Sequence, residues 1–330
     1  MSKVGRRILI TGGAGFVGFH LAERLSSDAS SEIVLVDNLV RGRMDREFLA
    51  LIAKPNLRFI NADLTDMSTY QSLSSGYDEV YHLAAIVGVK NVLANPPQVL
   101  RVNALSTILL LDWLVNGGGN RLLYSSTSET YAWTQQFHEL PIPTPEDVPL
   151  ALTDLKNPRA TYAGSKIFGE LAISQYCKAS NGQYVIVRYH NVYGPRMGRE
   201  HVIPELLLRS MAGESPLVVN SANHSRAFCY VSDAVDCTVA LMRGNGTSGE
   251  TYNVGNSREE VTMGELAKVI MRAVGHDAPI HERDAINDPI RRRCPDISKA
   301  AAAVGYHPRV GIEEGVALTA EWYRQGMDGS

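Results

Sequence analysis

One stretch decides the fold of this chain: Arg7-Ile8-Leu9-Ile10-Thr11-Gly12-Gly13-Ala14-Gly15-Phe16-Val17-Gly18. An apolar run leads straight into glycines at 12, 15 and 18, and apolar residues with a helical period follow. This pattern predicts a strand, a tight turn and a helix. Gly12 permits the turn, Gly15 lets the backbone approach a pyrophosphate, and Gly18 allows close packing of the helix on the sheet. Glycine turns also join strands to helices without a ligand, so the stretch alone leaves a binding role open.

A second apolar run ends in an acid at the spacing that a dinucleotide site requires. Ile33-Val34-Leu35-Val36 is followed by Asp37, 19 residues after Gly18. An acid at that place hydrogen-bonds the 2′-hydroxyl of the adenosine ribose. Arg41 and Arg43 follow, and arginines there can select a 2′-phosphate, but Asp37 would repel one. We therefore expect a dinucleotide site that takes NAD rather than NADP.

The composition is that of an ordinary soluble protein. The 330 residues are 45% hydrophobic and 20% charged, and the net charge of −3 gives no reason to expect nucleic acid. No apolar stretch approaches the roughly 20 residues that span a bilayer, so we expect no membrane segment. Residues 1–7 lead directly into a strand, so we expect no signal peptide. The four cysteines lack metal-ligand spacing, which favours reduced thiols in a cytoplasmic protein and no metal site.

Strand-like and helix-like segments alternate along the first part of the chain. This alternation predicts parallel βαβ units and a Rossmann-type, doubly wound parallel sheet of the α/β class. Two later segments, 228–231 and 250–254, look like strands that return to this sheet. The other expected strands cover 57–60, 79–83, 121–124 and 184–188, and the expected helices cover 44–54, 99–115 and 160–177.

The alternation loosens beyond Gly194-Pro195, which indicates a second domain. We expect an NAD-binding domain over 1–186, with returning segments near 227–257. A smaller, interleaved domain over 187–226 and 258–330 would then supply contacts to the substrate.

Polar or small residues follow several strands, at the edge where open parallel sheets bind ligands. Asp63 comes just after the third strand, where it either contacts adenine or caps a helix that starts near Asp66. Spacing alone leaves both roles open. Ala84 and Ala85 follow the fourth strand, where small residues would let a cofactor lie against the backbone or would merely pack.

The segment Tyr162-Ala163-Gly164-Ser165-Lys166 places a phenol and an ammonium on one face of a helix. The Lys166 charge and the positive nicotinamide of NAD⁺ would both favour the tyrosinate, so Tyr162 could act as a base near neutral pH. An isolated motif of this kind is usually an amphipathic helix with a packed tyrosine and a solvated lysine. Its position after a dinucleotide fingerprint and a polar strand end favours the catalytic interpretation.

Taken together, these motifs resemble the extended short-chain dehydrogenase/reductase family, the NAD-dependent epimerases and dehydratases that act on nucleotide sugars. The resemblance implies transient oxidation of a sugar hydroxyl by tightly held NAD⁺, with the hydride returned before release. It runs over nearly the whole chain, in the family's order: the glycine pattern, Asp37, Asp63-Leu64, His82-Leu83-Ala84-Ala85, the cluster Ser125 to Tyr131, the Tyr162/Lys166 motif and Asn191-Val192-Tyr193-Gly194-Pro195-Arg196.

The resemblance also implies which residues carry the chemistry and hold the two ligands. Thr127 would bridge the sugar 4-hydroxyl and Tyr162, with Ser128, Glu129 and Arg226 around C5 and C6. Catalysis is thus implied for Thr127, Ser128, Glu129, Tyr162 and Lys166. Cofactor contacts are implied for Gly12, Gly15, Phe16, Val17, Gly18, Asp37, Asn38, Asp63, Leu64, Leu83, Ala84, Ala85, Asn103, Tyr162, Lys166 and Val192. Substrate contacts are implied for Lys90, Thr127, Asn191, Val202, Arg226 and Arg292.

Within the family, Ser126-Thr127-Ser128-Glu129-Thr130-Tyr131 is most similar to the matching segment of UDP-glucuronate decarboxylases. Oxidation of C4 in a hexuronate creates a ketone β to the carboxylate, so C6 can leave as CO₂ through an enolate that the site then protonates. Ser128 stands where 4,6-dehydratases carry Asp, and Glu129 stands where simple 4-epimerases usually lack an acid. The resemblance therefore favours decarboxylation.

Other reactions stay open as alternatives. They are NDP-sugar 4-epimerisation, including that of UDP-glucuronate, and dehydration or 5-epimerisation. A protein of a different class, a non-catalytic dinucleotide sensor, would not need Thr127, Tyr162 and Lys166.

Several features depart from the decarboxylase pattern. The loop 86–91 differs from its usual form, and Lys90 within it either binds a carboxylate or caps a turn. His190 stands where decarboxylases tend to have an apolar ring, and we expect a packed, hydrogen-bonded residue rather than a catalyst. The stretch 198–204 is shorter than the usual nucleotide-binding loop. These departures leave the exact sugar open.

The arginine run 291–293 lies where the family clamps a diphosphate, and two alignments of it disagree. Alignment from Asp288-Pro289 favours Arg292, whereas alignment from Pro295-Asp296 favours Arg293. A guanidinium binds phosphate oxygens bidentately, so either residue is suited to the role.

The resemblance finally implies the partners of this chain. The substrate is expected to be a nucleotide sugar, with a UDP-sugar favoured. A homodimer is implied, formed through the helix over 99–115 and the helix that carries Tyr162. We expect no nucleic acid and no membrane partner.

Overall fold

The computed structural model describes residues 5–284 and 290–328, and these fold into two compact units. The first unit comprises Met1–Thr130, Leu152–Arg188 and Val235–Tyr252. The second comprises Tyr131–Ala151, Tyr189–Ala234 and Asn253–Ser330. This division differs from the expected one in two places. Residues 131–151 belong to the second unit, and the segment that returns to the first is 235–252 rather than 227–257.

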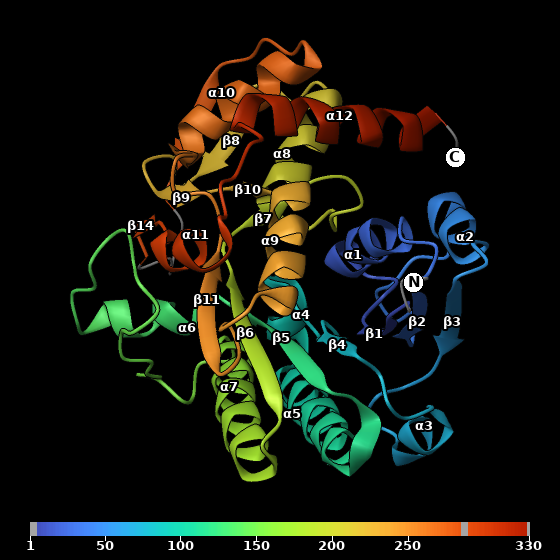
Figure 1. The fold of residues 1–330 in the computed structure, drawn as a ribbon. Coiled ribbons are helices and arrows are strands. Elements are labelled where there is room, and N and C mark those ends of the chain that lie inside the picture. The colour runs from blue at the N-terminus through green and yellow to red at the C-terminus, as the bar shows by residue number, and fades with distance from the viewer. Residues whose placement is uncertain (1–4, 285–289, 329–330) are drawn as a thin grey trace. The chain divides into compact units, whose positions relative to one another are not determined.

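The first unit contains a seven-stranded sheet with the strand order β3-β2-β1-β4-β5-β6-β11 (Figure 1). The pairs that β1 makes with β2 and β4 are parallel, as are β2 with β3 and β4 with β5. This confirms the predicted Rossmann-type sheet. The strands are β1 (Arg7–Thr11), β2 (Glu32–Asp37), β3 (Leu57–Asn61), β4 (Glu79–His82), β5 (Arg121–Thr127), β6 (Gln183–Tyr189) and β11 (Glu250–Val254).

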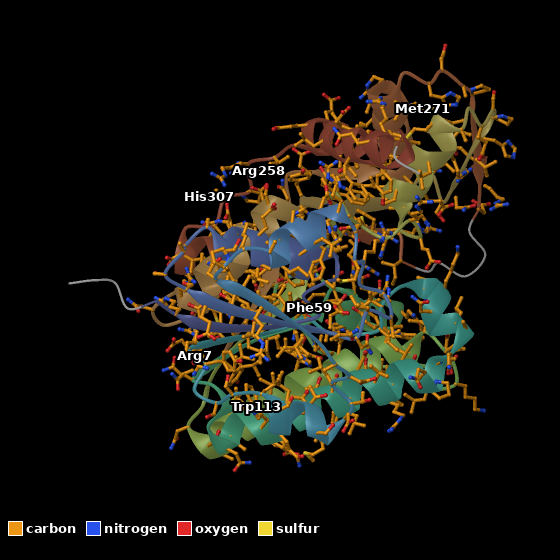
Figure 2. All side chains as sticks on the ribbon, turned by 90° about the vertical axis from the view of Figure 1, so that its right-hand side faces the viewer. Arg7, Phe59, Trp113, Arg258, Met271 and His307 are labelled. Carbon is orange, nitrogen blue, oxygen red and sulfur yellow. The ribbon has the colours of Figure 1, made fainter. Side chains whose placement is uncertain are left out.

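Helices cover both faces of this sheet. In Figure 2, α5 and α7 lie on one face and α1 lies on the other, with Trp113 in the helical layer and Phe59 in the sheet. Figure 1 shows α5 and α7 side by side, and their residues pack against each other. The helices of this part are α1 (Phe16–Ser26), α2 (Arg46–Ile52), α3 (Met67–Ser72), α4 (Val89–Ala94), α5 (Pro96–Trp113), α6 (Glu129–Ala132), α7 (Ala160–Ser180) and α9 (Val231–Arg243).

Helix α5 begins earlier than the apolar pattern predicted. Asn95 caps it by accepting a hydrogen bond from the backbone N–H of Gln98, and prolines occupy its first positions, where their missing N–H costs nothing. A π-helical turn, Leu114–Gly118, extends it to Gly117, which has φ 91° and so ends the helix.

The same helix corrects the expectation that no apolar stretch is long enough to span a bilayer. By length and composition alone, Pro96–Gly118 would suffice. In the structure this segment packs on α7 and α3, and residues such as Leu110 and Leu111 are fully buried in the core.

The second unit contains small sheets and several helices among its described residues. β7 (Val192–Tyr193) pairs with β10 (Cys229–Tyr230), so the segment 228–231 does not return to the main sheet, and that expectation is wrong. β11 does join the main sheet, as expected. The other elements are α8 (Val202–Met211), β8 (Leu217–Asn220), β9 (Ser225–Ala227), β12 (Glu260–Thr262), α10 (Met263–Val274), β13 (Ile280–Arg283), β14 (Arg292–Arg293), α11 (Ser298–Val304) and α12 (Ile312–Asp328).

A glycine lets α7 approach β5 closely. A Cβ atom at Gly169 would lie 2.1 Å from the hydroxyl oxygen of Tyr124, a β5 residue that is 1% exposed. The Tyr124 ring is itself stacked on His82, with 5.8 Å between the ring centroids. The ring therefore has little room to move away from an added methyl group.

We predict that Gly169→Ala lowers the free energy of unfolding by about 1–3 kcal/mol, the usual cost of overpacking a core. Chemical denaturation followed by circular dichroism measures this. Gly326→Ala in α12 is the matched control, because no described atom lies within 4 Å of a Cβ there. The control should be unchanged or slightly more stable, since alanine favours a helix. Equal stability of the two variants would contradict the close contact.

Candidate active site

The glycine turn between β1 and α1 has the geometry of an anion site. Gly12 has φ 72°, and a Cβ there would lie 2.8 Å from the backbone nitrogen of Ala84. A Cβ at Gly18 would lie 2.1 Å from the carbonyl oxygen of Gly12. No described side chain caps α1, and its first turn holds no acid. The N–H groups of Phe16 and Val17 thus belong to a positive helix end that suits a diphosphate.

Asp37 fixes the loop that follows β2. Its Oδ1 accepts a hydrogen bond from Leu39 N at 2.8 Å, and its Oδ2 accepts one from Ala14 N at 3.2 Å. Burial raises the pKa of Asp37, and these two backbone hydrogen bonds oppose the rise. The carboxylate therefore joins the end of β2 to the glycine turn, at the place predicted to bind the ribose.

Asp63 does not cap the following helix. The cap of α3 is Asp66, which accepts a hydrogen bond from Ser68 N at 2.9 Å. Asp63 accepts from the N–H and the hydroxyl of Thr65, both at 2.8 Å, and from Asn38 Nδ2 at 3.5 Å. Burial raises the pKa of Asp63, but these hydrogen bonds bring it below its usual value. The structure thus excludes the capping role for Asp63 and leaves the contact with adenine as a prediction. Asp63 lies beside Asn38.

Asn103 holds the loop after β4. Its Oδ1 accepts from Ile86 N at 2.7 Å, and its Nδ2 donates to Ile86 O at 3.2 Å and to Ser165 Oγ at 3.1 Å. The side chain is 2% exposed. Asn103 therefore joins this loop to α7. Other predicted residues lie along the same loop. The backbone N–H of Leu83 donates to Thr11 O and that of Ala84 donates to Thr11 Oγ1, Ala85 comes next, and Lys90 is exposed in α4. Leu64, which follows β3, is buried in the core.

The predicted catalytic residues of β5 and α7 come together in the first unit. Strand β5 extends to Thr127, three residues beyond the predicted end, and Thr127 is hydrogen-bonded to the phenol of Tyr162. Burial raises the pKa of Tyr162 to about 12, the Thr127 hydrogen bond lowers it, and the Glu129 charge raises it. Ser128 follows Thr127 in the chain and is 3% exposed. The chain thus groups a phenol, a hydroxyl and a carboxylate at one strand end.

Lys166 is buried rather than solvated. Its side chain is 3% exposed, and its Nζ donates to Ser125 O at 2.7 Å and lies 4.8 Å from the centre of the Tyr124 ring. Burial lowers the pKa of Lys166 to about 7, and the Glu170 charge opposes this. The interpretation of the motif as a solvated helix face is therefore wrong.

A buried ion pair behind Lys166 was missed by the sequence analysis. Ser126 Oγ donates to Glu170 Oε1 at 2.5 Å, while Arg188 Nε donates to Oε1 at 2.9 Å and Arg188 Nη2 donates to Oε2 at 2.6 Å. These bonds tie α7 to β5 and β6. The signal that was available is the position of Glu170, one helical turn beyond Lys166.

A second missed network lies under the glycine turn. His82 Nδ1 is 2.8 Å from Thr11 Oγ1, and His82 Nε2 is 3.3 Å from Thr107 Oγ1. Burial, and to a lesser extent the Lys166 charge, lowers the pKa of His82 to about 3. His82 is therefore neutral at physiological pH and acts as a link between β1, β4 and α5.

In the second unit, the predicted residues 192 and 202 begin elements, and residue 191 precedes one of them. Asn191 has φ 39°, and its Nδ2 donates to Ala227 O at 2.9 Å; Val192 begins β7 and Val202 begins α8. His190 is 1% exposed, and its Nε2 lies 3.0 Å from Asn253 Oδ1. This confirms that His190 is a packed, hydrogen-bonded residue.

Strand pairing separates the arginines of the second unit. β14 is parallel to β9, with Arg293 opposite Arg226 and Arg292 opposite Ser225. Paired residues share a face of the sheet, so Arg226 and Arg293 lie on one face and Arg292 on the other. Arg292 forms a bidentate ion pair with Glu260, at 2.7 and 2.9 Å. The alternative alignment, from Asp288-Pro289, starts outside the described residues.

A cavity of about 260 Å³ also lies in the second unit, and Figure 2 labels two of its lining residues, Arg258 and His307. None of the predicted site residues lines it. It is therefore separate from the groups described above.

Comparison with known proteins shows the family to which the chain belongs. Residues 8–255 match the NAD dependent epimerase/dehydratase family. The chain is 35% identical over 328 residues to UDP-glucuronic acid decarboxylase 1 of Xenopus tropicalis, which covers 99% of this chain and 74% of that protein. It is 32% identical over 335 residues to a dTDP-glucose 4,6-dehydratase of an Actinoplanes strain, covering 96% and 98%.

Among solved structures, the chain is similar to DesIV, a dTDP-glucose 4,6-dehydratase of Streptomyces venezuelae with NAD bound. The TM-score is 0.87, the sequence identity is 26%, and 98% of each chain is covered. These matches confirm the predicted resemblance to the extended short-chain dehydrogenase/reductase family, and they support NAD as the cofactor. The chain belongs to the NAD-dependent epimerase/dehydratase family and is an NAD-dependent sugar-modifying enzyme.

Proposed function

We propose that this enzyme is a UDP-glucuronate decarboxylase that oxidises C4 of the sugar transiently. The observation that carries the proposal is the end of β5, where Thr127 is hydrogen-bonded to the Tyr162 phenol and the Glu129 charge acts on the same phenol. The similarity to decarboxylases over nearly the whole chain supports it. A non-catalytic sensor would not require this group of residues around a buried lysine.

Tyr162 acts as the base for the sugar 4-hydroxyl, through the hydrogen bond that Thr127 makes with it. Lys166 favours the tyrosinate through its charge, and Ser125 O fixes its position. The glycine turn and Asp37 would hold NAD, which would supply an acceptor for the C4 hydride and a source for its return.

Ser128 and Glu129 favour loss of CO₂ over the competing reactions. A ketone at C4 is β to the C6 carboxylate, so the C5–C6 bond breaks and its electron pair forms an enolate, which one proton from the site quenches. Ser128 has no acidic proton to give to a departing 6-hydroxyl, which argues against 4,6-dehydration. The similarity to a dTDP-glucose 4,6-dehydratase supports 4,6-dehydration as a second candidate function, together with 4-epimerisation.

We also infer a homodimer formed through α5 and α7. The exposed apolar residues Leu93, Leu100, Phe168 and Leu171, on α4, α5 and α7, support this. Leu171→Glu should shift the sedimentation coefficient to that of the monomer.

The reaction is tested by incubating the enzyme with a panel of UDP-, dTDP-, GDP- and CDP-sugars and following products by NMR and mass spectrometry. We expect CO₂ and a UDP-pentose from UDP-glucuronate. Absence of CO₂ at high enzyme concentration would sink the decarboxylase assignment. An epimer or loss of water from one of the sugars would assign the enzyme to the corresponding subgroup instead.

Thr127→Val should move the pH profile of kcat/KM. The rising limb reports deprotonation of Tyr162, and the Thr127 hydrogen bond lowers the pKa of that phenol. Removing a hydrogen bond of ~1.4 kcal/mol raises the pKa, so the limb moves up by about one pH unit. Tyr162→Phe should lose about 10²-fold or more in kcat and show no such limb. A limb that stays in place in Thr127→Val would contradict the proposed contact.

Arg293 and Arg292 are distinguished by their effects on KM. We assign the nucleotide diphosphate to the face of β9 and β14 that carries Arg226 and Arg293. Arg293→Gln should then raise the KM of the UDP-sugar about tenfold, the value of one charge-assisted hydrogen bond. Arg292→Gln, which loses its pairing with Glu260, should change KM less than about threefold, as for an exposed ion pair. The reverse order would return the assignment to Arg292.

A further inference from the structure

The loop after β2 is folded back onto the glycine turn. Leu39 has φ 60°, and Arg43 N donates to Ala14 O at 3.4 Å. A Cβ at Gly42 would lie 2.6 Å from Ala14 Cβ and 2.8 Å from Asp37 Oδ1. The loop therefore has a fixed course against the turn, and the residue before Gly42 has a defined position.

Arg41 is that residue, and its side chain reaches the loop after β4. Its Nη1 donates to Val87 O at 2.5 Å, and the same carbonyl accepts from Asn91 Nδ2 at 2.8 Å. The Arg41 charge also acts on Tyr162, whose pKa it lowers against the rise that burial causes. The hydrogen bond of Arg41 joins two loops that are far apart in the sequence.

Strand order places the glycine turn between the two loops that the Arg41–Val87 hydrogen bond joins. β1 pairs with β2 on one side and with β4 on the other, and all three are parallel. The loops after β2 and β4 therefore flank the glycine turn after β1. A bond from Arg41 to Val87 crosses from one flanking loop to the other, past the N-terminal end of α1 where a diphosphate is expected.

We propose that Arg41 is a clamp that closes over the diphosphate of bound NAD and retains the cofactor. A guanidinium has five N–H donors in a planar fork, so it can bind phosphate oxygens while it keeps a carbonyl partner. Retention matters because the hydride taken from the sugar must return to the same sugar. The proposal rests on NAD as the cofactor, and it does not depend on which sugar reaction follows.

This role differs from the one that the sequence suggested for an arginine in this loop. A residue that selects a 2′-phosphate would lie at the ribose, beside Asp37. The hydrogen bond to Val87 instead places the Arg41 guanidinium on the side of the loop after β4. Arg41 is thus expected to respond to the diphosphate common to NAD and NADP and to leave the choice between them to Asp37.

The test measures NAD release from the purified holoenzyme without any sugar, by stopped-flow displacement with excess ADP-ribose. Arg41→Gln should release NAD about tenfold faster or more, as for the loss of a hydrogen bond between charged groups. Arg41→Lys keeps the positive charge but lacks the planar guanidinium, so its rate of NAD release should lie between those of the wild type and Arg41→Gln. Arg46→Gln, which removes the same charge from the exposed first turn of α2, is the matched control and should release NAD at the wild-type rate.

A second measurement separates the clamp from a general effect on the loop. Calorimetric titration of the cofactor-free protein should show that Arg41→Gln weakens ADP-ribose about tenfold and leaves adenosine, which lacks phosphate, unchanged. Equal weakening of both ligands would show that Arg41 only supports the fold of the loop, and unchanged NAD release would also overturn the proposal. Because neither measurement uses a sugar, their results do not bear on the decarboxylase assignment, which the product analysis tests separately.

Discussion

The burial of one amine constrains much of the first unit. Lys166 is 3% exposed, and an ammonium in such a place is costly unless polar groups surround it. Ser125 O, the Tyr124 ring and the Glu170 charge provide that environment. Glu170 is in turn held by Arg188 and Ser126, so α7 can take only one register against β5 and β6. The position of Tyr162, one turn before Lys166, follows from that register.

The cofactor side is organised by neutral hydrogen bonds in the same way. His82 links β1 to α5 through two threonine hydroxyls, and burial keeps its ring uncharged. Asn103 carries the connection onward to the loop after β4 and to α7. The loop that flanks the glycine turn is therefore fixed to the helix that bears the catalytic phenol, and such prior positioning is what a reaction with a returning hydride needs.

The residues proposed for the reaction and those proposed for recognition of the nucleotide lie in different parts of the chain. Ser128 and Glu129 follow the end of β5 in the first unit, and in the proposed reaction they bear on the fate of the oxidised sugar. Arg226 and Arg293 share one face of the β9 and β14 pair in the second unit. A family with one cofactor site can thus carry several sugar reactions, because changes at a strand end and in the later loops leave the glycine turn untouched.

The sequence by itself determined several features whose partners lie within a few residues of one another. Local spacing predicts the glycine turn, Asp37 at the end of β2 and the shared helix face of Tyr162 and Lys166. It also predicts the alternation of strands and helices that forms the sheet. Tertiary structure alone decided the features that join distant segments. These include the Glu170 and Arg188 pair, the side-by-side placement of Arg226 and Arg293, and the reach of Arg41 to Val87. The reason is physical: strand order and register bring such groups together, and neither can be read from the spacing of residues along the chain.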